Sequence, residues 1–281
     1  MADVQWPGGL SCPVCDASLA AGRGVLRCAA GHSYDIARQG YVNMLPPKAH
    51  IGTADTPEMV ASRDVFLASG HYRPIAERVA ELVATAVGER PGAIVEVGAG
   101  TGEYLAVVLD RMTARLGIAF DISKHACRRA AGAHERMRAV VCDAWGRLPL
   151  RDGSAAAVMS IFAPRNPVEF ARVLADGGAL VVVTPTAEHL GSLVRGLGLV
   201  RVDPRKDERL EAQLSPRFGC VSSEHIERRL RLSRAEVAAA VAMGPSARHC
   251  PFELLQEASG AMPEPLEALL SVRISVWRTL L

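Results

Sequence analysis

The chain has 281 residues, nearly half of them apolar, and a formal net charge of +2. This length accommodates one full α/β domain and a small appendage. No apolar run reaches the length of a membrane span, so we expect no transmembrane helix. The nearly neutral charge excludes a uniformly basic protein, so any nucleic-acid-binding surface must be local. The N-terminus has neither a basic start nor an apolar core, so we expect no signal peptide.

Four potential metal ligands near the N-terminus have the spacing C-x2-C-x12-C-x3-H: Cys12, Cys15, Cys28 and His32. Two thiolates on one tight turn can hold one side of a tetrahedral Zn²⁺ ion, and the second pair can close the other side. Four protein ligands leave no open position, so we expect a structural zinc site. A chance grouping of thiols is the alternative. The other cysteines are scattered singly, which is not a disulfide pattern and fits a reducing cytoplasm.

The sequence pattern divides the chain into three expected segments. Residues 1–45 are expected to form the zinc-binding module, with short strands around the metal. Residues 46–90 are expected to form a linker and two helices, near Pro57–Ala68 and Pro74–Val87, which both begin with a proline at an early helical position. Residues 91–281 are expected to form the α/β domain.

The α/β domain begins with alternating strands and helices. The expected strands are Ala93–Val97, Leu116–Phe120, Ala139–Cys142, Ala155–Ile161 and Ala179–Val183. The expected helices run from the turn after the first strand to Leu109, over Lys124–Ala131 and over Val168–Leu174. Continuous apolar strands separated by helices indicate a parallel sheet covered on both faces. Near the C-terminus, Cys220–Leu232 and Ser271–Leu280 alternate as antiparallel strands do, and helices are expected at Arg234–Met243 and Pro265–Leu270.

A glycine-rich turn, E-x-G-x-G-x-G over Glu96–Gly102, follows the first of these strands. Glycines there allow a sharp turn and a close approach to a ligand, at the switch point where open α/β sheets bind ligands. Asp121 follows the second strand, where an acid can accept both ribose hydroxyls. Asp143 follows the third, where an acid can accept from an adenine amino group. The alternative for both acids is a helix-capping role in a loop.

This layout resembles the class I S-adenosylmethionine-dependent methyltransferases. Their Rossmann-like sheet has seven strands, and the two antiparallel segments near the C-terminus fit its final hairpin. The resemblance implies an α/β fold and S-adenosylmethionine as the cofactor.

A zinc module followed by such a core, together with Gly31–Asn43, resembles the RlmA-type 23S rRNA (guanine-N1)-methyltransferases. Further matching segments are Ser69–Tyr72 with Pro74, Ala163–Pro164, Thr184–Pro185 with His189–Leu190, and Met243–Ser246. The forms Phe162–Pro167 and Met243–Ser246 look closest to the TlrB-like branch, which confers resistance to tylosin- and mycinamicin-type macrolides. That branch methylates a guanine of the 748 type in hairpin 35, and the housekeeping branch methylates a neighbouring guanine. Relatives are thought to act as dimers, so the resemblance allows a homodimer.

The resemblance also assigns site residues. It places the metal ligands on the four residues named above. It places cofactor contacts on Tyr72, Gly100, Thr101 and His189. These add to the cofactor residues expected from the strand-end pattern, which are Gly98, Asp121 and Asp143. The loop after the fourth strand is where class I enzymes hold the target base, so Arg165 and Asn166 are the candidate substrate residues. The group that receives the guanine N1 proton stays unknown.

Three basic clusters could contact RNA, or could be solvated surface: Arg23, Arg27 and Arg38; Lys124, Arg128 and Arg129; and Arg228, Arg229 and Arg231. Two further functions stay open. A small-molecule methyltransferase of a natural-product pathway would share the cofactor site but leave the zinc module unexplained. A non-catalytic zinc-dependent RNA-binding protein is opposed by the intact glycine turn with Asp121.

Overall fold

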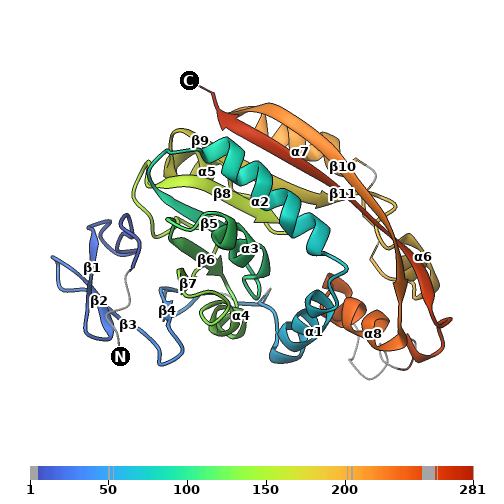
Figure 1. Ribbon diagram of the computed structural model, residues 1–281. Coiled ribbons are helices and arrows are strands. Elements are labelled where there is room, and N and C mark those ends of the chain that lie inside the picture. Colours follow the sequence, from blue (N-terminus) through green and yellow to red (C-terminus); the bar gives the residue numbers. More distant parts are fainter. Residues whose placement is uncertain are drawn as a thin grey trace.

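The computed structural model describes residues 6–280, except residues 50, 53, 201, 204, 249–256 and 258. A large mixed sheet lies between helices, and a small N-terminal module lies beside one edge of that sheet (Figure 1). None of the helices among the described residues is long and apolar enough to cross a membrane.

The large sheet has eight strands among the described residues. In spatial order they are β10 (Phe218–Leu232), β11 (Leu266–Thr279), β9 (Leu174–Pro185), β8 (Ala155–Ile161), β5 (Ala93–Val97), β6 (Gly117–Asp121), β7 (Met137–Val141) and β4 (Tyr41–Asn43). The strands from β9 to β4 are parallel, and β11 and β10 are antiparallel to their neighbours. The chain runs from β5 outward to β6 and β7 and then returns to β8 and β9. The switch point therefore lies between β5 and β8.

Strand β4 belongs to the large sheet although it lies within the expected zinc module. It pairs with β7 and extends the expected seven strands by one. The module's own sheet consists of β1 (Leu19–Gly22), β2 (Val25–Cys28) and β3 (Ser33–Asp35). Leu10 and Leu26 of the module are buried in the same apolar cluster as Val42 of β4 and Leu150. The module is therefore packed onto the edge of the α/β domain.

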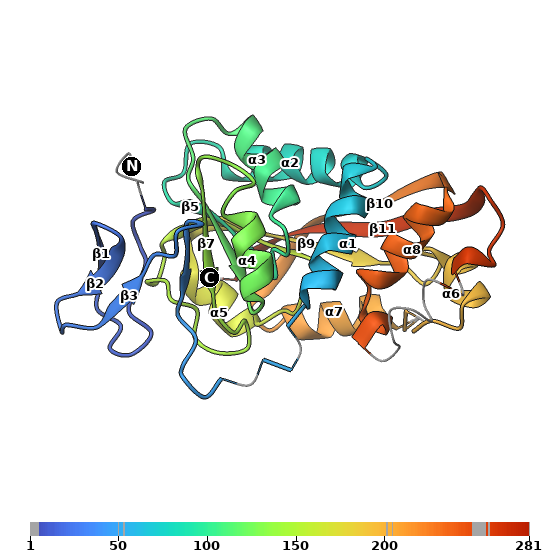
Figure 2. The ribbon, with the colours of Figure 1, turned by 90° about the horizontal axis from the view of Figure 1, so that it is seen from below.

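Helices cover both faces of the sheet (Figure 2). One face carries α2 (Arg73–Val87), α3 (Glu103–Arg111) and α4 (Lys124–Ala130), and the other carries α5 (Pro167–Val173) and α7 (Lys206–Leu214). The remaining helices, α1 (Pro57–Ala68), α8 (Arg234–Ala242), α6 (Gly191–Gly196) and the 3-10 turn η1 (Pro245–Arg248), lie toward the carboxyl ends of the parallel strands. Helices α1 and α8 contact each other.

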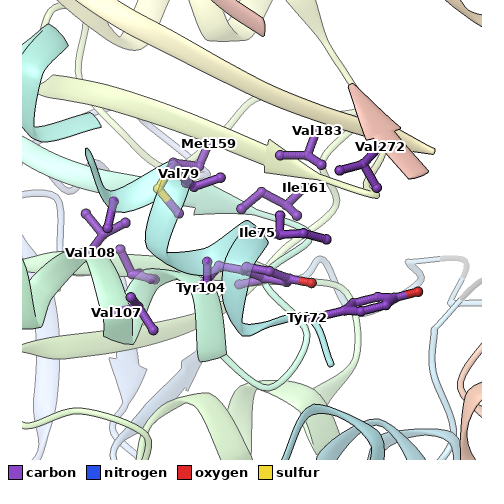
Figure 3. Close-up of a cluster of buried hydrophobic side chains, with 14 of the residues drawn as sticks. Tyr72, Ile75, Val79, Tyr104, Val107, Val108, Met159, Ile161, Val183 and Val272 are labelled. Atoms are coloured by element: carbon purple, nitrogen blue, oxygen red, sulfur yellow. The ribbon is translucent and has the colours of Figure 1, made fainter. Parts of the chain in front are cut away.

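The apolar periodicity of α2 explains its position. Its residues Ile75, Val79, Val83 and Val87 recur at helical spacing, and all four are fully buried. Figure 3 shows two of them facing apolar side chains of the central strands, with Tyr72 at the edge of the same cluster. The hydroxyl group of Tyr72 points away from these aliphatic side chains.

The helix expected at Pro265–Leu270 was wrong, because Leu266 begins strand β11. Apolar residues in so short a segment do not distinguish a helix from a strand. Pairing with β10 decides it, since the register continues to Leu266 opposite Leu232. Strand β9 also begins earlier than expected, at Leu174, and α6, α7 and η1 were not predicted.

Candidate active site and metal centre

The four predicted metal ligands lie together in the N-terminal module. One ligand atom from each of Cys12, Cys15, Cys28 and His32 lies within 4.8 Å of all the others. Two turns present them. The amide of Asp16 donates to the carbonyl of Cys12, and the amide of Gly31 donates to the carbonyl of Cys28. Gly31 has φ +89°, a conformation that favours glycine.

The distances between these atoms fit a tetrahedral zinc ion. The Sγ atoms of Cys15 and Cys28 are 3.7 Å apart, and Nδ1 of His32 lies 3.4 Å from Sγ of Cys28. Zn–S bonds of about 2.3 Å in a tetrahedron place two sulfurs about 3.8 Å apart. Burial raises the pKa of the Cys12 thiol, but hydrogen bonds from Tyr34 and from backbone amides outweigh this effect and lower that pKa to about 6. The donor set therefore suits a structural Zn²⁺.

A cavity of about 780 Å³ opens at the carboxyl ends of the parallel strands, within the range of cofactor sites. Its wall includes the turns that follow β5, β6, β7 and β8, together with α1, α6, α7 and α8. Of the predicted cofactor residues, the cavity is lined by Tyr72, Gly98, Gly100, Asp121, Asp143 and His189. Thr101 is buried in the same turn and does not line the cavity.

The glycine-rich turn is closely packed on two sides. A Cβ atom on Gly98 would lie 2.5 Å from Cβ of Ala163, and one on Gly100 would lie 3.2 Å from Cδ of Arg63. Both glycines have positive φ angles, +72° and +55°. Glycine at position 98 therefore lets the loop after β8 approach the turn, which brings the end of β8 beside the predicted cofactor site.

The acids at the strand ends hold this turn in place. Asp121 accepts hydrogen bonds from the amides of Gly100 and Ser123, both at 2.8 Å. Glu96 is buried and accepts from the amide of Leu105 at 3.1 Å. Burial raises the pKa of both carboxyl groups, well above the usual value for Glu96. Asp121 thus has the loop-capping role named above as the alternative, yet it also lines the cavity.

Asp143 follows β7 at the cavity wall, and its Oδ1 accepts from the amide of Trp145 at 2.9 Å. Each carboxylate oxygen of Asp121 and Asp143 has a second lone pair. Both acids can therefore cap their loops and still accept a hydrogen bond from a nucleoside.

Tyr72 and His189 are joined across the cavity wall, with 2.8 Å between the Tyr72 hydroxyl and Nε2 of His189. The amide of Ser271 donates to Nδ1 of His189, so in the neutral ring Nε2 carries the proton. That N–H donates to the oxygen of Tyr72, which leaves the phenolic hydrogen available to a ligand. Burial lowers the pKa of His189 to about 4, which keeps the ring neutral at physiological pH.

His189 makes stability depend on pH. The unfolded side chain takes up a proton below its ordinary pKa of 6.5, whereas the folded one stays neutral to about 4. Its contribution to the free energy of unfolding is therefore present above pH 6.5 and lost as the pH falls toward 4, by about 3 kcal/mol in all. Urea unfolding at a series of pH values should show that the free energy of unfolding falls less between pH 6.5 and 4 in His189→Gln than in the wild type. The control is His225→Gln, at an exposed position on β10. If the free energy of unfolding changed equally with pH in all three proteins, His189 would not be the source of the pH dependence.

The sequence-based prediction missed Arg63 and Asp55, which also line the cavity. The guanidinium of Arg63 donates to Asp55 at 2.7 Å and to the carbonyl of Met243 at 3.3 Å. No local motif marks Arg63, since it is one arginine within the helix α1.

The part of the cavity beside β8 and α7 has a different character. Phe162 has φ +53° and is 37% exposed, and its ring lies 5.9 Å from that of Tyr72 and 5.8 Å from that of His189. Arg165 and Lys206 line the same region, and burial lowers the pKa of each. An aromatic face beside two cations suits a planar base with polar oxygens.

The two candidate substrate residues have different surroundings. Arg165 lines the cavity and donates to Gln213 at 3.2 Å and to the carbonyl of Ala163 at 3.2 Å. Asn166 is the N-cap of α5, and its amide donates to carbonyls of the loop after β7, Ala144 to Gly146. Asn166 does not line the cavity, so it connects two loops and does not face the space where a base would lie.

These observations define the class of protein. The switch-point cavity offers a glycine turn for close backbone approach, two acids at successive strand ends for a nucleoside, and a tyrosine hydroxyl, and so fits S-adenosylmethionine. The protein is a class I S-adenosylmethionine-dependent methyltransferase with a structural zinc site.

Comparison with known proteins identifies the family. Residues 10–50 match the family model of the RlmA N-terminal zinc ribbon, and residues 95–182 match that of a methyltransferase domain. A Micromonospora griseorubida protein that carries the name of a 23S rRNA (guanine-N1)-methyltransferase is 48% identical, over 96% of this chain and 97% of its own. The 23S rRNA (guanine(748)-N1)-methyltransferase of Streptomyces fradiae is 46% identical, with the same coverage. The chain belongs to the family of 23S rRNA (guanine-N1)-methyltransferases with an RlmA-type zinc ribbon.

Solved structures show the fold. The MccD protein aligns with a TM-score of 0.50 and 18% identity, over 74% of this chain and 98% of that one.

Proposed function

We propose that this enzyme methylates N1 of the 748-type guanine in hairpin 35 of 23S rRNA and thereby protects a cell against tylosin- and mycinamicin-type macrolides. The observation that carries the proposal is the relative from Streptomyces fradiae, whose name specifies guanine 748 and whose similarity extends through both the zinc ribbon and the methyltransferase domain. With ribosomal RNA as its substrate, we expect the enzyme to act in the cytoplasm.

The cavity supports a guanine beside the cofactor. The residues assigned to the cofactor lie at the ends of β5, β6 and β7, whereas Phe162 and Arg165 lie after β8. The aromatic face of Phe162 can stack on a flipped base, and Arg165 and Lys206 can approach its O6 edge. Trp145, which lines the cavity and is 64% exposed, offers a second stacking face for the flanking RNA.

The chemistry needs alignment and removal of one proton. The bound cofactor supplies an electrophilic methyl group on a sulfonium. The loop after β8 has to hold guanine N1 in line with that carbon, and most of the acceleration can come from this positioning and from the exclusion of water. When N1 loses its proton, negative charge spreads to O6. The cations of Arg165 and Lys206 face this region and would stabilise that charge.

The zinc module supports RNA binding. Arg23, Arg27 and Arg38 are exposed on it. Among the described residues these three make no ion pair, whereas Arg129 pairs with Asp64 and Arg231 with Glu267 in the other two basic clusters. We propose that the module supplies phosphate contacts that position the hairpin.

Reverse transcription of 23S RNA tests the proposal. A macrolide-sensitive host that expresses the protein should show a stop one nucleotide before the 748-type guanine, because an N1 methyl group blocks the Watson–Crick edge. Arg165→Met should weaken the stop at least about tenfold, the effect expected on losing a charged hydrogen-bond donor. Calorimetry should show that it keeps its affinity for S-adenosylhomocysteine. Arg151→Met, an exposed arginine outside the cavity, is the matched control.

The alternatives give different results. A stop at the neighbouring guanine would assign the chain to the housekeeping branch. The absence of a stop anywhere in the RNA, combined with methylation of a macrolide aglycone in vitro, would assign it to small-molecule methylation.

A further inference from the structure

Arg63 occupies an unusual position in the cavity wall. It lies on α1, which precedes β5 in the chain, and its side chain contacts the glycine-rich turn that follows β5. A Cβ atom on Gly100 would lie 3.2 Å from Cδ and 3.3 Å from Nε of Arg63. The side chain of Arg63 therefore covers the turn at Gly100.

The guanidinium is incompletely paired. One nitrogen, Nη2, donates both to Asp55 and to the carbonyl of Met243. Nε is buried, and the described residues provide no acceptor for it. A buried donor without an acceptor is costly, and a charged one especially so. The hydrogen bonds of the described residues use only Nη2, and since Arg63 lines the cavity and its side chain is 27% exposed, a ligand in the cavity can approach the guanidinium at Nη1.

The strand ends indicate which part of the cofactor reaches Arg63. Asp121 after β6 is assigned to the ribose, and Asp143 after β7 to the adenine. The acceptor base is assigned to the loop after β8. The remaining part of S-adenosylmethionine is its amino acid end, which then lies at the turn after β5, beside Arg63.

We propose that Arg63 binds the α-carboxylate of S-adenosylmethionine. A guanidinium N–H donates a charge-assisted hydrogen bond to a carboxylate, and here Nη1 would provide it, because Nη2 already donates to Asp55 and Met243. Asp55 holds the guanidinium through Nη2 and lines the cavity, so its carboxylate can accept from the ammonium group of the same amino acid. The carboxylate of the cofactor would thus meet the cation of Arg63, and its ammonium group would meet the anion of Asp55. The inference concerns the cofactor and does not depend on which RNA is methylated.

Binding of two matched ligands tests this assignment without any measurement of activity. S-adenosylhomocysteine carries the α-carboxylate, and S-adenosyl-3-thiopropylamine differs from it only in lacking that group. Calorimetry with the wild-type protein should give at least about tenfold tighter binding of the first ligand, the effect of one charge-assisted contact. In Arg63→Met this preference should fall to about twofold or less, while Arg63→Lys should keep part of it because the charge remains.

The control is Arg73→Met, which removes an exposed arginine paired with Glu77 on α2, outside the cavity. It should keep the wild-type preference. A preference that persists in Arg63→Met would overturn the assignment, as would a wild-type protein that binds both ligands equally. The second result needs no variant, so the proposal stays testable even if Arg63→Met fails to fold.

Discussion

Replacement of Cys15 by serine should remove the zinc ion and abolish methylation of 23S RNA while cofactor binding persists. The apparent binding energy of a structural zinc is about 10–16 kcal/mol, more than so small a module can recover from its own apolar contacts. The module has only short strands, and its buried residues Leu10 and Leu26 pack against the α/β domain. Residues 10–40 should therefore become sensitive to proteolysis, and the exposed arginines should lose their fixed arrangement.

Three measurements separate the two parts of the molecule. Metal analysis should find one zinc per wild-type chain and none in Cys15→Ser. Calorimetry should give the same affinity for S-adenosylhomocysteine in both, because no zinc ligand lines the cavity. The matched control is Cys220→Ser, another exposed thiol, on β10. Stoichiometric zinc in Cys15→Ser, or none in the wild type, would refute the metal assignment.

Substitution of Gly98 by alanine should both destabilise the protein and abolish cofactor binding. The backbone there has φ +72°, which costs an L-residue about 1–2 kcal/mol. The added Cβ would also lie 2.5 Å from Cβ of Ala163, a short side chain that cannot rotate away. Either the glycine turn or the loop after β8 must shift, at a further cost of about 1–3 kcal/mol. Either shift alters the cavity where cofactor and base are expected to meet.

Gly153→Ala distinguishes backbone strain from the close contact. Gly153 has φ +64°, and its nearest neighbour would lie 3.9 Å from an added Cβ. Urea unfolding should show the strain cost alone for Gly153→Ala, with cofactor affinity unchanged, and a larger loss for Gly98→Ala, with no measurable binding of S-adenosylhomocysteine. If the two variants lost the same stability and kept the same cofactor affinity, the close contact between the β8 loop and the glycine turn would contribute to neither property.

Local sequence patterns identified most of the elements that build the site. The first strand, the glycine turn and the acids at positions 121 and 143 follow one another within short distances along the chain. Parallel strands then bring their carboxyl ends to one edge of the sheet whatever the details of packing. The same reasoning could not distinguish a strand from a helix at 265–270, where a short apolar segment suits both and only pairing with β10 decides.

The residue-level chemistry of the cavity depended on contacts between distant segments. Arg63 reaches the turn at Gly100 only because α1 packs beside α8 and over the strand ends, and Tyr72 meets His189 across 117 positions. Asn166 was a candidate for the substrate, but the fold directs its amide to the loop after β7.

By itself the sequence determined the zinc ligand set, the α/β class and the location of the cofactor site at the strand ends. Each of these rests on short turns or on the common direction of neighbouring strands. Only the tertiary structure decided which charges face the cavity, that the zinc module is joined to the large sheet through β4, and how the β8 loop meets the glycine turn. Those features depend on side-chain packing between elements far apart in the chain, and no local spacing encodes that packing.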